Sequence, residues 1–347
     1  MKKTIKWISS FLIFLLCFGI LFTNIAERLR RKTAGEVDMV NSFYRLEENS
    51  LDVLMLGSSH LYYGVQPNIL WGEHGITAYA MGSPQQTIAT SYLLLKEALK
   101  YQKPKVLLLE SYYFWYDGLY NEESRLRQAF DAVRYGDVKT EMIETFLPEL
   151  TFKDKLSYYL PFLKYHSRWS ELKAQDFHTK AYLQGCLLDY GVIENTDPGL
   201  DIDPVSIPEV NLEYFEKIVD LCEENAIQLV VFATPYGVDE KWERYETRQG
   251  ITLTLERYLE EREIPFLFYQ KTGEAGINFD EDFRDETHLN AIGAGKITRC
   301  LGSYLTSHYD MEDHRGDAEY QLWEEDYALY MKDVEKKTES GGTEDNR

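Results

Sequence analysis

Residues 51–60 read LDVLMLGSSH, a short apolar run that ends in a glycine and two serines. An apolar run of this length is typical of a strand that is buried on both faces of a parallel sheet. Gly57 permits a sharp turn after the strand, and the serines would then lie at the carboxyl end, where open α/β sheets bind ligands. The same residues also fit a serine that only caps a helix. This stretch alone therefore indicates a structural serine more often than a catalytic one.

The alternation of strands and helices around this stretch predicts the fold class. Gln86 to Tyr101 carries apolar residues at helical spacing, and residues 209–225 and 239–261 also read as helices. Buried strands are expected at residues 52–57, 76–81, 106–109, 228–233 and 265–269. This order predicts an α/β protein: a three-layer α/β/α sandwich with a five-stranded, parallel, flavodoxin-like sheet.

The domain organisation follows from where the alternation of strands and helices stops. Residues 114–208 are aromatic and charged, with helical stretches but no buried strand, and we interpret them as an insertion covering the ligand edge of the sheet. One domain is therefore expected over residues 51–308. A polar stalk over residues 33–50 precedes it, and an acidic tail over residues 309–347 follows it, with a short helix at 318–336 and a disordered end.

The N-terminal segment is long and apolar enough to cross a membrane. Residues 7–26 read WISSFLIFLLCFGILFTNIA without a charge, and basic residues flank both ends. At about 1.5 Å per residue, this run spans a hydrocarbon core of about 30 Å. Because no small-x-small cleavage site follows it, we predict an uncleaved transmembrane anchor within residues 1–32. The charges on both sides leave its orientation open.

The amino-acid composition limits the kinds of partner that the chain could bind. The formal net charge of −21 argues against nucleic acid, while the 26 tyrosines suit either a sugar-binding surface or a filled core. The four cysteines lack metal-ligand spacing. They are Cys17, Cys186, Cys222 and Cys300. We expect no metal and no other cofactor.

A second motif, Asp285-Glu286-Thr287-His288, follows the last predicted strand. A serine hydroxyl needs a base to take its proton and a carboxylate to orient that base. An aspartate three residues before a histidine can turn back to the imidazole, although an isolated motif of this kind also fits helix capping. Together with the serine after the first strand, the motif predicts a Ser59–His288–Asp285 triad.

On these motifs the chain resembles the SGNH/GDSL hydrolases, and within them the membrane-anchored, DltD-like and polysaccharide O-acetylation-like branch. The resemblance covers residues 51–305. Gly57-Ser58-Ser59 resembles the first block of that family, with Ser59 at the nucleophile position and Ser58 in place of an aspartate. Gly82 matches the second-block glycine, whose N–H helps to form the oxyanion hole. The last block places His288 as the base and Asp285 as its orienting partner.

One departure from the family concerns the oxyanion hole. The third block normally supplies an asparagine, whereas the third strand here ends in Glu110-Ser111-Tyr112. Loss of one oxyanion donor costs on the order of 3 kcal/mol. The chain is therefore a slow enzyme, an enzyme with a substituted donor, or an inactive binder. The candidate donors are Ser111, Tyr112, Gln85 and Gln86.

Weaker candidates lie near the motifs and in the insertion. His60 either lines the pocket, together with Tyr112, or faces solvent at the start of a helix. In the insertion, His166, Arg168 and Trp169 pair an aromatic plane with a cation, which suits a saccharide or anionic polymer as well as helix packing. A metal held by His60, Asp285 and His288 lacks a further ligand and is disfavoured.

The resemblance implies a bacterial cell-membrane protein with a cytoplasmic N-terminus and a single span. Its extracytoplasmic domain would be a serine esterase or O-acyltransferase that acts on cell-wall or extracellular polysaccharide through an acyl-Ser59 intermediate. A multi-pass membrane O-acyltransferase is the implied partner. The alternative is a catalytically inactive module of the same fold that binds a glycan or such a partner.

Overall fold

Five parallel strands form one sheet in the order β2-β1-β3-β4-β5. The computed structural model describes residues 2–30, 38–177, 184–238 and 242–339. The strands are β1 (Val53–Gly57), β2 (Ala78–Gly82), β3 (Val106–Glu110), β4 (Gln228–Ala233) and β5 (Phe266–Phe268). The predicted sheet is confirmed. Because the strands are parallel, the loops after β1, β2 and β3 leave the same edge, and Gly57 lies directly beside Gly82.

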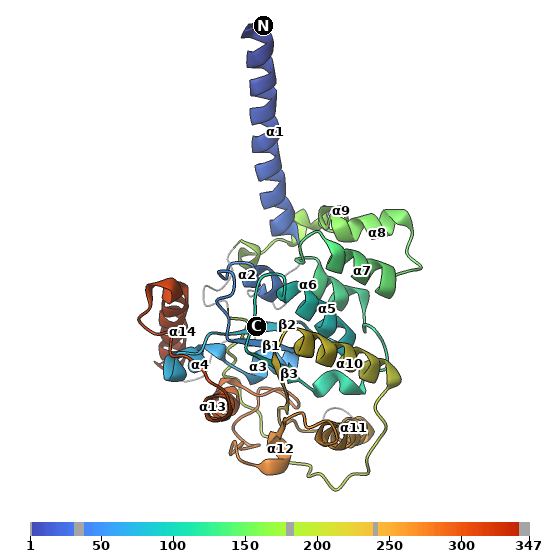
Figure 1. Cartoon of the computed structure of the whole chain (residues 1–347), viewed down its shortest axis with the longest axis vertical. Helices are drawn as coiled ribbons and strands as arrows, with labels where there is room; N and C mark the ends of the chain where they lie inside the picture. Colours follow the sequence, from blue (N-terminus) through green and yellow to red (C-terminus); the bar gives the residue numbers. More distant parts are fainter. Residues whose placement is uncertain (1, 31–37, 178–183, 239–241, 340–347) are drawn as a thin grey trace.

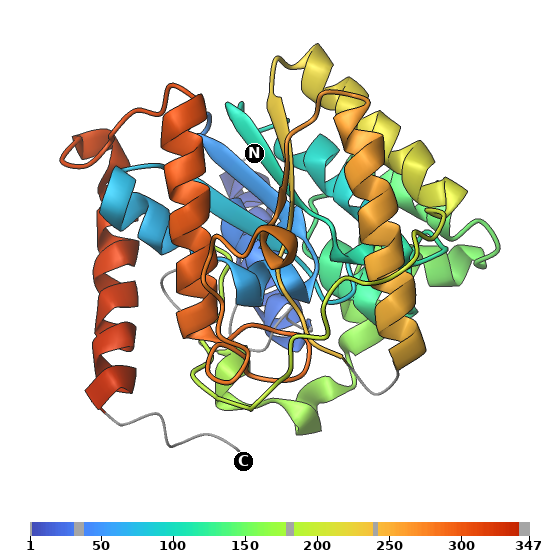
Figure 2. The same ribbon diagram turned by 90° about the horizontal axis from the view of Figure 1, so that it is seen from below.

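Alternate residues of the strands face two helical layers. Val53 and Met55 pack toward one layer, whereas Leu54 and Leu56 pack toward the other, and all four are fully buried. This double burial explains why β1 is apolar throughout rather than alternating. One layer contains α3 (Ser59–Gly64), α4 (Pro67–His74) and α13 (Ala291–His308); the other contains α5 (Ile88–Ala98), α10 (Glu209–Glu224) and α11 (Trp242–Glu260). Figure 2 shows the strands between α13 on one side and α10 and α11 on the other.

Gly57 is required by a close approach of β3. A Cβ at this position would lie 2.5 Å from the Cβ of Glu110 and 3.1 Å from that of Leu61. We expect Gly57→Ala to destabilise the fold by about 2 kcal/mol and to lower Tm by about 4–8 °C, because a Cβ cannot rotate away. Thermal unfolding followed by circular dichroism measures this. Gly136→Ala is the control, since its Cβ meets only the Lys100 ammonium at 3.7 Å; equal effects of both variants would contradict the prediction.

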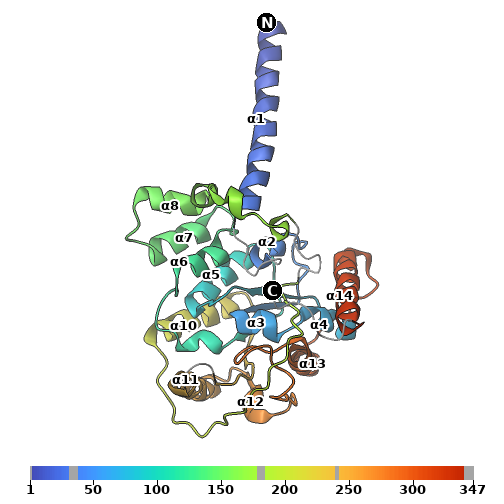
Figure 3. The ribbon, with the colours of Figure 1, turned by 180° about the vertical axis from the view of Figure 1, so that it is seen from behind.

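The insertion divides into two parts with different positions. Its helices α6 (Glu123–Phe130), α7 (Asp137–Phe146), α8 (Phe152–Tyr159) and α9 (Phe162–Tyr165) extend from α5 toward the end from which α1 leaves (Figures 1 and 3). The irregular part over residues 184–208 instead runs along the ligand edge. It bonds the backbone there at Leu187, Ile193 and Asn195. The expected covering of that edge therefore applies to this second part and, among the helices, to α6, which lies against the loop after β2.

Helix α1 (Lys2–Leu29) is the one described helix that is long and apolar enough to cross a membrane, by length and composition. Either a membrane anchor or a signal sequence satisfies that description. Its last turn is joined to the domain by ionic contacts. Arg30 is buried and pairs with Glu27 and Asp38, and Arg28 donates to the Phe177 carbonyl at 3.1 Å. Residues 31 and 32 of the predicted anchor lie outside the described residues.

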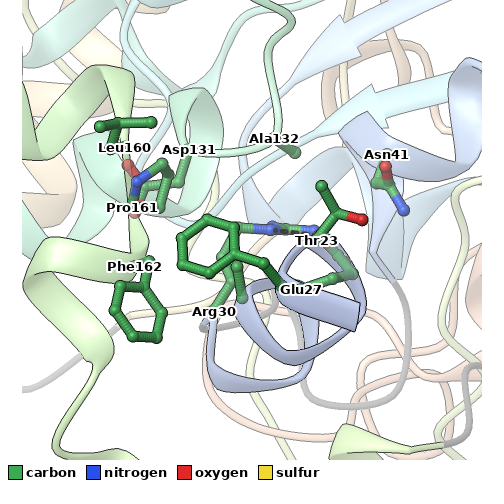
Figure 4. A pocket seen from close by; sticks show the side chains of 11 residues that line it. Thr23, Glu27, Arg30, Asn41, Asp131, Ala132, Leu160, Pro161 and Phe162 are labelled. Carbon is green, nitrogen blue, oxygen red and sulfur yellow. Dashed lines mark hydrogen bonds and ion pairs between the residues drawn. The ribbon is translucent and has the colours of Figure 1, made fainter. Parts of the chain in front are cut away.

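A cavity of about 240 Å³ opens at this junction. Figure 4 shows Arg30 and Glu27 of the α1 end facing Pro161 and Phe162 of the insertion across it. Among the described residues that line it, the one cation, Arg30, is already paired with two carboxylates. We assign this cavity to the packing of α1 against the domain.

The helix expected at residues 318–336 of the acidic tail is present, and it packs on the domain. Helix α14 (Gln321–Glu339) packs on α4, with Trp323 buried and its ring centroid 6.1 Å from that of Trp71. Tyr330 is buried as well, and its hydroxyl bonds to Gln66. The apolar stripe of the helix, rather than its acidic face, decides its position. Residues 340–347 of the expected disordered end lie outside the described residues.

Part of the predicted stalk is also folded. Helix α2 (Met39–Phe43) lies within it, and both end residues are buried. The Phe43 ring packs edge-on against Tyr79 of β2, with centroids 5.6 Å apart. Residues 33–37 of the stalk lie outside the described residues.

Candidate active site

Ser58 and Ser59 have different tasks at the turn from β1 into α3. Ser58 is the N-cap of α3: its Oγ accepts a hydrogen bond from the His60 N–H at 3.3 Å. Its N–H and hydroxyl both donate to Oε2 of Glu110, at 3.3 and 3.1 Å. Ser59 is the first helical residue and is only partly buried. The serine cap and the candidate nucleophile are thus adjacent but separate residues.

The structure brings Ser59, His288 and Asp285 together. Nε2 of His288 lies 2.7 Å from Oγ of Ser59, and Nδ1 lies 2.9 and 3.1 Å from the two carboxylate oxygens of Asp285. With Nδ1–H donating to Asp285, Nε2 is left to accept the serine proton. The geometry is that of a nucleophile, a base and an orienting carboxylate.

The carboxylate of Asp285 is held in its charged form. Burial alone would raise its pKa, but hydrogen bonds from the His288 ring and from the backbone of His288 and Thr287 outweigh burial. They lower the pKa of Asp285 to about 2. Asp285 therefore stays ionised at any pH at which the imidazole could act as a base.

Part of the insertion holds the loop that carries Asp285 and His288 in place. Arg284 pairs with Asp189 at 3.2 Å, and the side-chain amide of Asn195 donates to the Glu286 carbonyl at 2.8 Å. The Gly237 N–H after β4 donates to the same carbonyl at 2.9 Å. Sequence reasoning missed Asp189, Asn195 and Arg284, because their positions depend on how an irregular segment crosses the domain.

The backbone N–H groups of Gly82 and Ser59 lie outside the hydrogen bonds of the β1–β2 ladder and of α3. In the ladder, Ser83 donates to the Gly57 carbonyl, while Ala80 donates outward to Gln184. This alternation points the Gly82 N–H away from β1. The Ser59 N–H at the first turn of α3 likewise has no intrahelical acceptor. These are the two donors that the family resemblance implies.

The other predicted donors are already engaged or differ in character. The Ser111 N–H donates to the Phe232 carbonyl and the Tyr112 N–H to Glu110. Gln86 donates to the Met81 carbonyl and to Ser91. Gln85 differs, because it adopts a positive φ of 56° and buries its Oε1 without a hydrogen-bond partner among the described residues. Ser111 likewise buries its Oγ without a partner among the described residues. Because a hydroxyl can donate whereas an amide oxygen accepts, Ser111 is the candidate whose unpaired atom could serve an oxyanion.

Glu110 connects the loops that follow β1 and β3. It is buried, and besides Ser58 it accepts from the Tyr112 N–H at 2.6 Å. Desolvation raises its pKa to about 7, more than these hydrogen bonds lower it. The residue that ends β3 is therefore a structural brace with a titration near neutral pH.

An aromatic wall adjoins the triad on the side of His60. His60 is 3% exposed, so the solvent-facing alternative is wrong. Its ring stacks on Tyr112 with centroids 3.4 Å apart and lies 4.5 Å from the His288 ring. Burial, with the nearby His288 and Arg248, lowers the pKa of His60 well below its usual value. Because His60 is neutral, it does not repel the positive charge that His288 would carry after taking a proton.

Arg248 extends this wall outward. Its guanidinium carbon lies 5.1 Å from the Tyr112 ring centroid and 4.6 Å from that of Trp115. A cavity of about 230 Å³ adjoins Trp115 and Arg248 and is also lined by Thr247. Sequence reasoning missed this cavity, because α11 supplies most of its lining and carries no recognisable motif.

The three insertion candidates lie away from the triad. Arg168 is buried and donates to the Leu29 carbonyl and to Asp176, while His166 is exposed and contacts the Leu163 carbonyl at 3.0 Å. Trp169 is 57% exposed. These residues follow α9, at the end of the domain from which α1 leaves (Figure 1). Arg168 binds the end of α1, so the contacts favour the structural alternative for this residue.

No metal centre is evident in the described part of the chain. Within it, no group of three or more histidine, cysteine or acidic side chains could hold an ion. Cys17, Cys186, Cys222 and Cys300 are free thiols.

Comparisons with known proteins give a likeness in structure alone. No protein-family model matches the chain, and no curated protein matches it in sequence. It is similar to a protein assigned as an acylhydrolase from Bacteroides fragilis, with 10% identity, a TM-score of 0.39, and coverage of 77% of this chain and 94% of that one. It is also similar to a GDSL-like lipase from Bacteroides thetaiotaomicron, with 10% identity, a TM-score of 0.36, and coverage of 74% and 87%.

Proposed function

We propose that this chain is a membrane-anchored serine esterase or O-acyltransferase with Ser59 as its nucleophile. The observation that carries the proposal is the 2.7 Å contact between Ser59 Oγ and His288 Nε2, with Asp285 behind the imidazole. Side chains more than two hundred positions apart meet here at hydrogen-bond distance. A serine that served only as a helix cap would not need this arrangement, and Ser58 already supplies the cap.

The geometry supports a two-step acyl transfer. Ser59 Oγ attacks the carbonyl carbon of an ester while His288 Nε2 takes its proton. The tetrahedral oxyanion binds the N–H groups of Ser59 and Gly82. The C–O bond to the alcohol breaks as His288 returns the proton to that alcohol, leaving an acyl-Ser59 ester. A sugar hydroxyl or water then attacks the acyl group and gives its proton to His288. The ester bond to Ser59 breaks, and His288 returns the proton to Ser59 Oγ.

The location and the acceptor are part of the proposal. Helix α1 would remain as a single-pass anchor with a cytoplasmic N-terminus, and the domain would act outside the cytoplasm. By resemblance to the DltD-like branch, the acceptor would be a cell-wall or extracellular polysaccharide, and a multi-pass membrane O-acyltransferase would be the partner. The aromatic wall of Tyr112 and Trp115 beside the 230 Å³ cavity fits a sugar ring.

Labelling with a fluorophosphonate tests the proposal. We expect the full-length wild-type protein to be labelled, Ser59→Ala to lose the label completely, and His288→Ala to label at a small fraction of the wild-type rate. Ser303→Ala, which removes an exposed hydroxyl from α13, is the control and should label normally. Labelling of Ser59→Ala at the wild-type rate would overturn the assignment of the nucleophile.

An inactive binding module is the second candidate. It is favoured by the engaged N–H groups of Ser111 and Tyr112, which leave no backbone donor for the oxyanion from these two residues after β3. Absence of label on the folded wild-type protein would support this candidate instead.

A further inference from the structure

Exposed apolar side chains are concentrated in the part of the insertion that lies beside the end of α1. Among the described residues beyond α1, ten large apolar side chains are exposed, and five of them fall between Phe152 and Phe177. Single exposed apolar residues are normal on a protein surface, whereas a local concentration marks a contact surface. Figure 1 shows α8 and α9 at the end of the domain from which α1 leaves. The contact surface is therefore at that end.

Four of these side chains adjoin the residues that hold α1, and we call these four the collar. Each is between 43% and 57% exposed; they are Leu160, Leu163, Trp169 and Phe177. Leu160 lines the cavity at the junction together with Phe22 of α1. Leu163 follows Phe162, whose ring centroid lies 4.9 Å from that of Phe22. The first half of the collar is thus continuous with the side of α1.

The second half of the collar adjoins the last turn of α1. Trp169 follows Arg168, which donates to the Leu29 carbonyl. The Phe177 carbonyl accepts a hydrogen bond from Arg28 at 3.1 Å. Since neighbouring residues are fixed to α1 in both cases, the position of the collar relative to this helix is fixed as well.

The contact between Phe22 and Phe162 sets the depth of the collar. Phe22 belongs to the uncharged run of residues 7–26, which is long enough to cross a hydrocarbon core. It lies four residues before the end of this run, or about 6 Å along the helix. Segments that lie on a membrane bury their apolar side chains about 5–10 Å into the boundary between headgroups and acyl chains. If α1 spans a bilayer, Phe162 therefore reaches this boundary.

The charge of the segment also fits a lipid surface. Residues 151–177 contain five basic and three acidic residues, a net charge of +2, although the whole chain carries −21. Anionic headgroups attract basic residues close to the membrane, and tryptophan, here Trp169, is enriched at the membrane interface. A partner protein would also cover apolar side chains, but it would not explain why they lie level with the end of residues 7–26.

We propose that the collar is a second membrane contact, which lies in the headgroup boundary of the bilayer that α1 crosses. This inference rests on the anchor in the proposed function and adds a lipid-binding surface on the domain itself. It does not depend on the chemistry at Ser59.

Fluorescent labels in nanodiscs test this contact. The full-length protein is placed, one copy per disc, in phosphatidylcholine and phosphatidylglycerol, and is labelled through Leu163→Cys or Trp169→Cys. The native Cys17 and Cys300 are replaced by alanine, because neither is fully buried. We expect lipids with a doxyl group close to the headgroup to quench both labels about 2-fold or more, and lipids with the doxyl group near the end of the acyl chain to quench them less.

Two further labels separate the anchor from the collar. Leu16→Cys, near the middle of residues 7–26, should be quenched mainly by the doxyl group near the end of the acyl chain. Trp242→Cys is the matched control, because Trp242 is 45% exposed on α11, at the end of the domain opposite α1 (Figure 1), and neither lipid should quench it. If Leu16 is quenched but Leu163 and Trp169 are not, the collar is refuted and the anchor stands. If Leu16 is not quenched, the anchor fails and the collar with it.

A double variant tests whether the collar binds lipid as one surface. Leu160→Ser with Leu163→Ser should lower the quenching of the Trp169→Cys label by the shallow doxyl group about 2-fold or more. Both side chains are exposed, so we expect Tm and the quenching of the Leu16→Cys label to stay unchanged. Unchanged quenching of the Trp169→Cys label in the double variant would refute a shared contact.

Discussion

Replacing Asp285 by asparagine is expected to lower kcat for an activated ester such as 4-nitrophenyl acetate about 10⁴-fold. The asparagine keeps an oxygen for the N–H groups of Thr287 and His288, which now donate to Asp285 at 3.0 and 2.8 Å. Its NH₂ group would face Nδ1 of His288 and make that nitrogen an acceptor. The proton then moves to Nε2, which can no longer take the proton of Ser59.

The fold should survive this change, so stability and activity can be separated. We expect Tm of Asp285→Asn to remain close to that of wild type, with labelling of Ser59 slowed in parallel with kcat. Asp280→Asn removes an exposed carboxylate from the same loop and should leave kcat unchanged. A loss of less than 10-fold in Asp285→Asn would show that Asp285 does not set the tautomer of His288.

The second large effect concerns the pH dependence of stability at Glu110. Its pKa is raised from 4.5 to about 7 in the folded protein. A carboxyl group whose pKa is higher in the folded than in the unfolded protein stabilises the fold fully at pH values below its unfolded-state pKa. This stabilisation is lost as the pH rises through its folded-state pKa. The 2.5-unit difference between these pKa values corresponds to about 3 kcal/mol, lost between pH 4.5 and pH values above 7.

Glu110→Gln removes this titration. Relative to wild type, the free energy of unfolding of the variant should therefore improve by about 3 kcal/mol between pH 4.5 and pH 8. Urea unfolding at several pH values measures it, and the comparison between proteins cancels the other titrating groups. Glu149→Gln, on the surface, controls for the loss of one formal charge. Parallel stability curves for wild type and Glu110→Gln would contradict a buried titration at Glu110.

The parts of the protein that sequence could predict are those governed by local pattern. β1 was recognisable because burial on both faces demands an unbroken apolar run. The triad was recognisable because Ser59 and the Asp285–His288 motif each follow a strand, and parallel strands bring their carboxyl ends to one edge.

The parts that sequence could not predict depend on packing between distant segments. Arg125 and Arg127 are two positions apart on α6, yet the Nε of Arg125 is buried without an acceptor among the described residues, whereas Arg127 pairs with two carboxylates. No local pattern separates them. The sequence favours a solvent-facing His60 over one that lines the pocket, because its burial comes from Tyr112 on the loop after another strand. Arg168 looked like a ligand-binding cation, but its role follows from the position of Leu29.

The ionic contacts at the end of α1 determine how the domain is oriented relative to this helix. Arg30 joins the helix to Asp38 at the start of α2, and Arg168 grips the Leu29 carbonyl from the insertion. If α1 spans a bilayer, these contacts hold the domain at a fixed distance from the membrane and in a fixed orientation. Ser59 would then face one direction relative to the membrane. A long substrate would have to pass Ser59 in one defined direction.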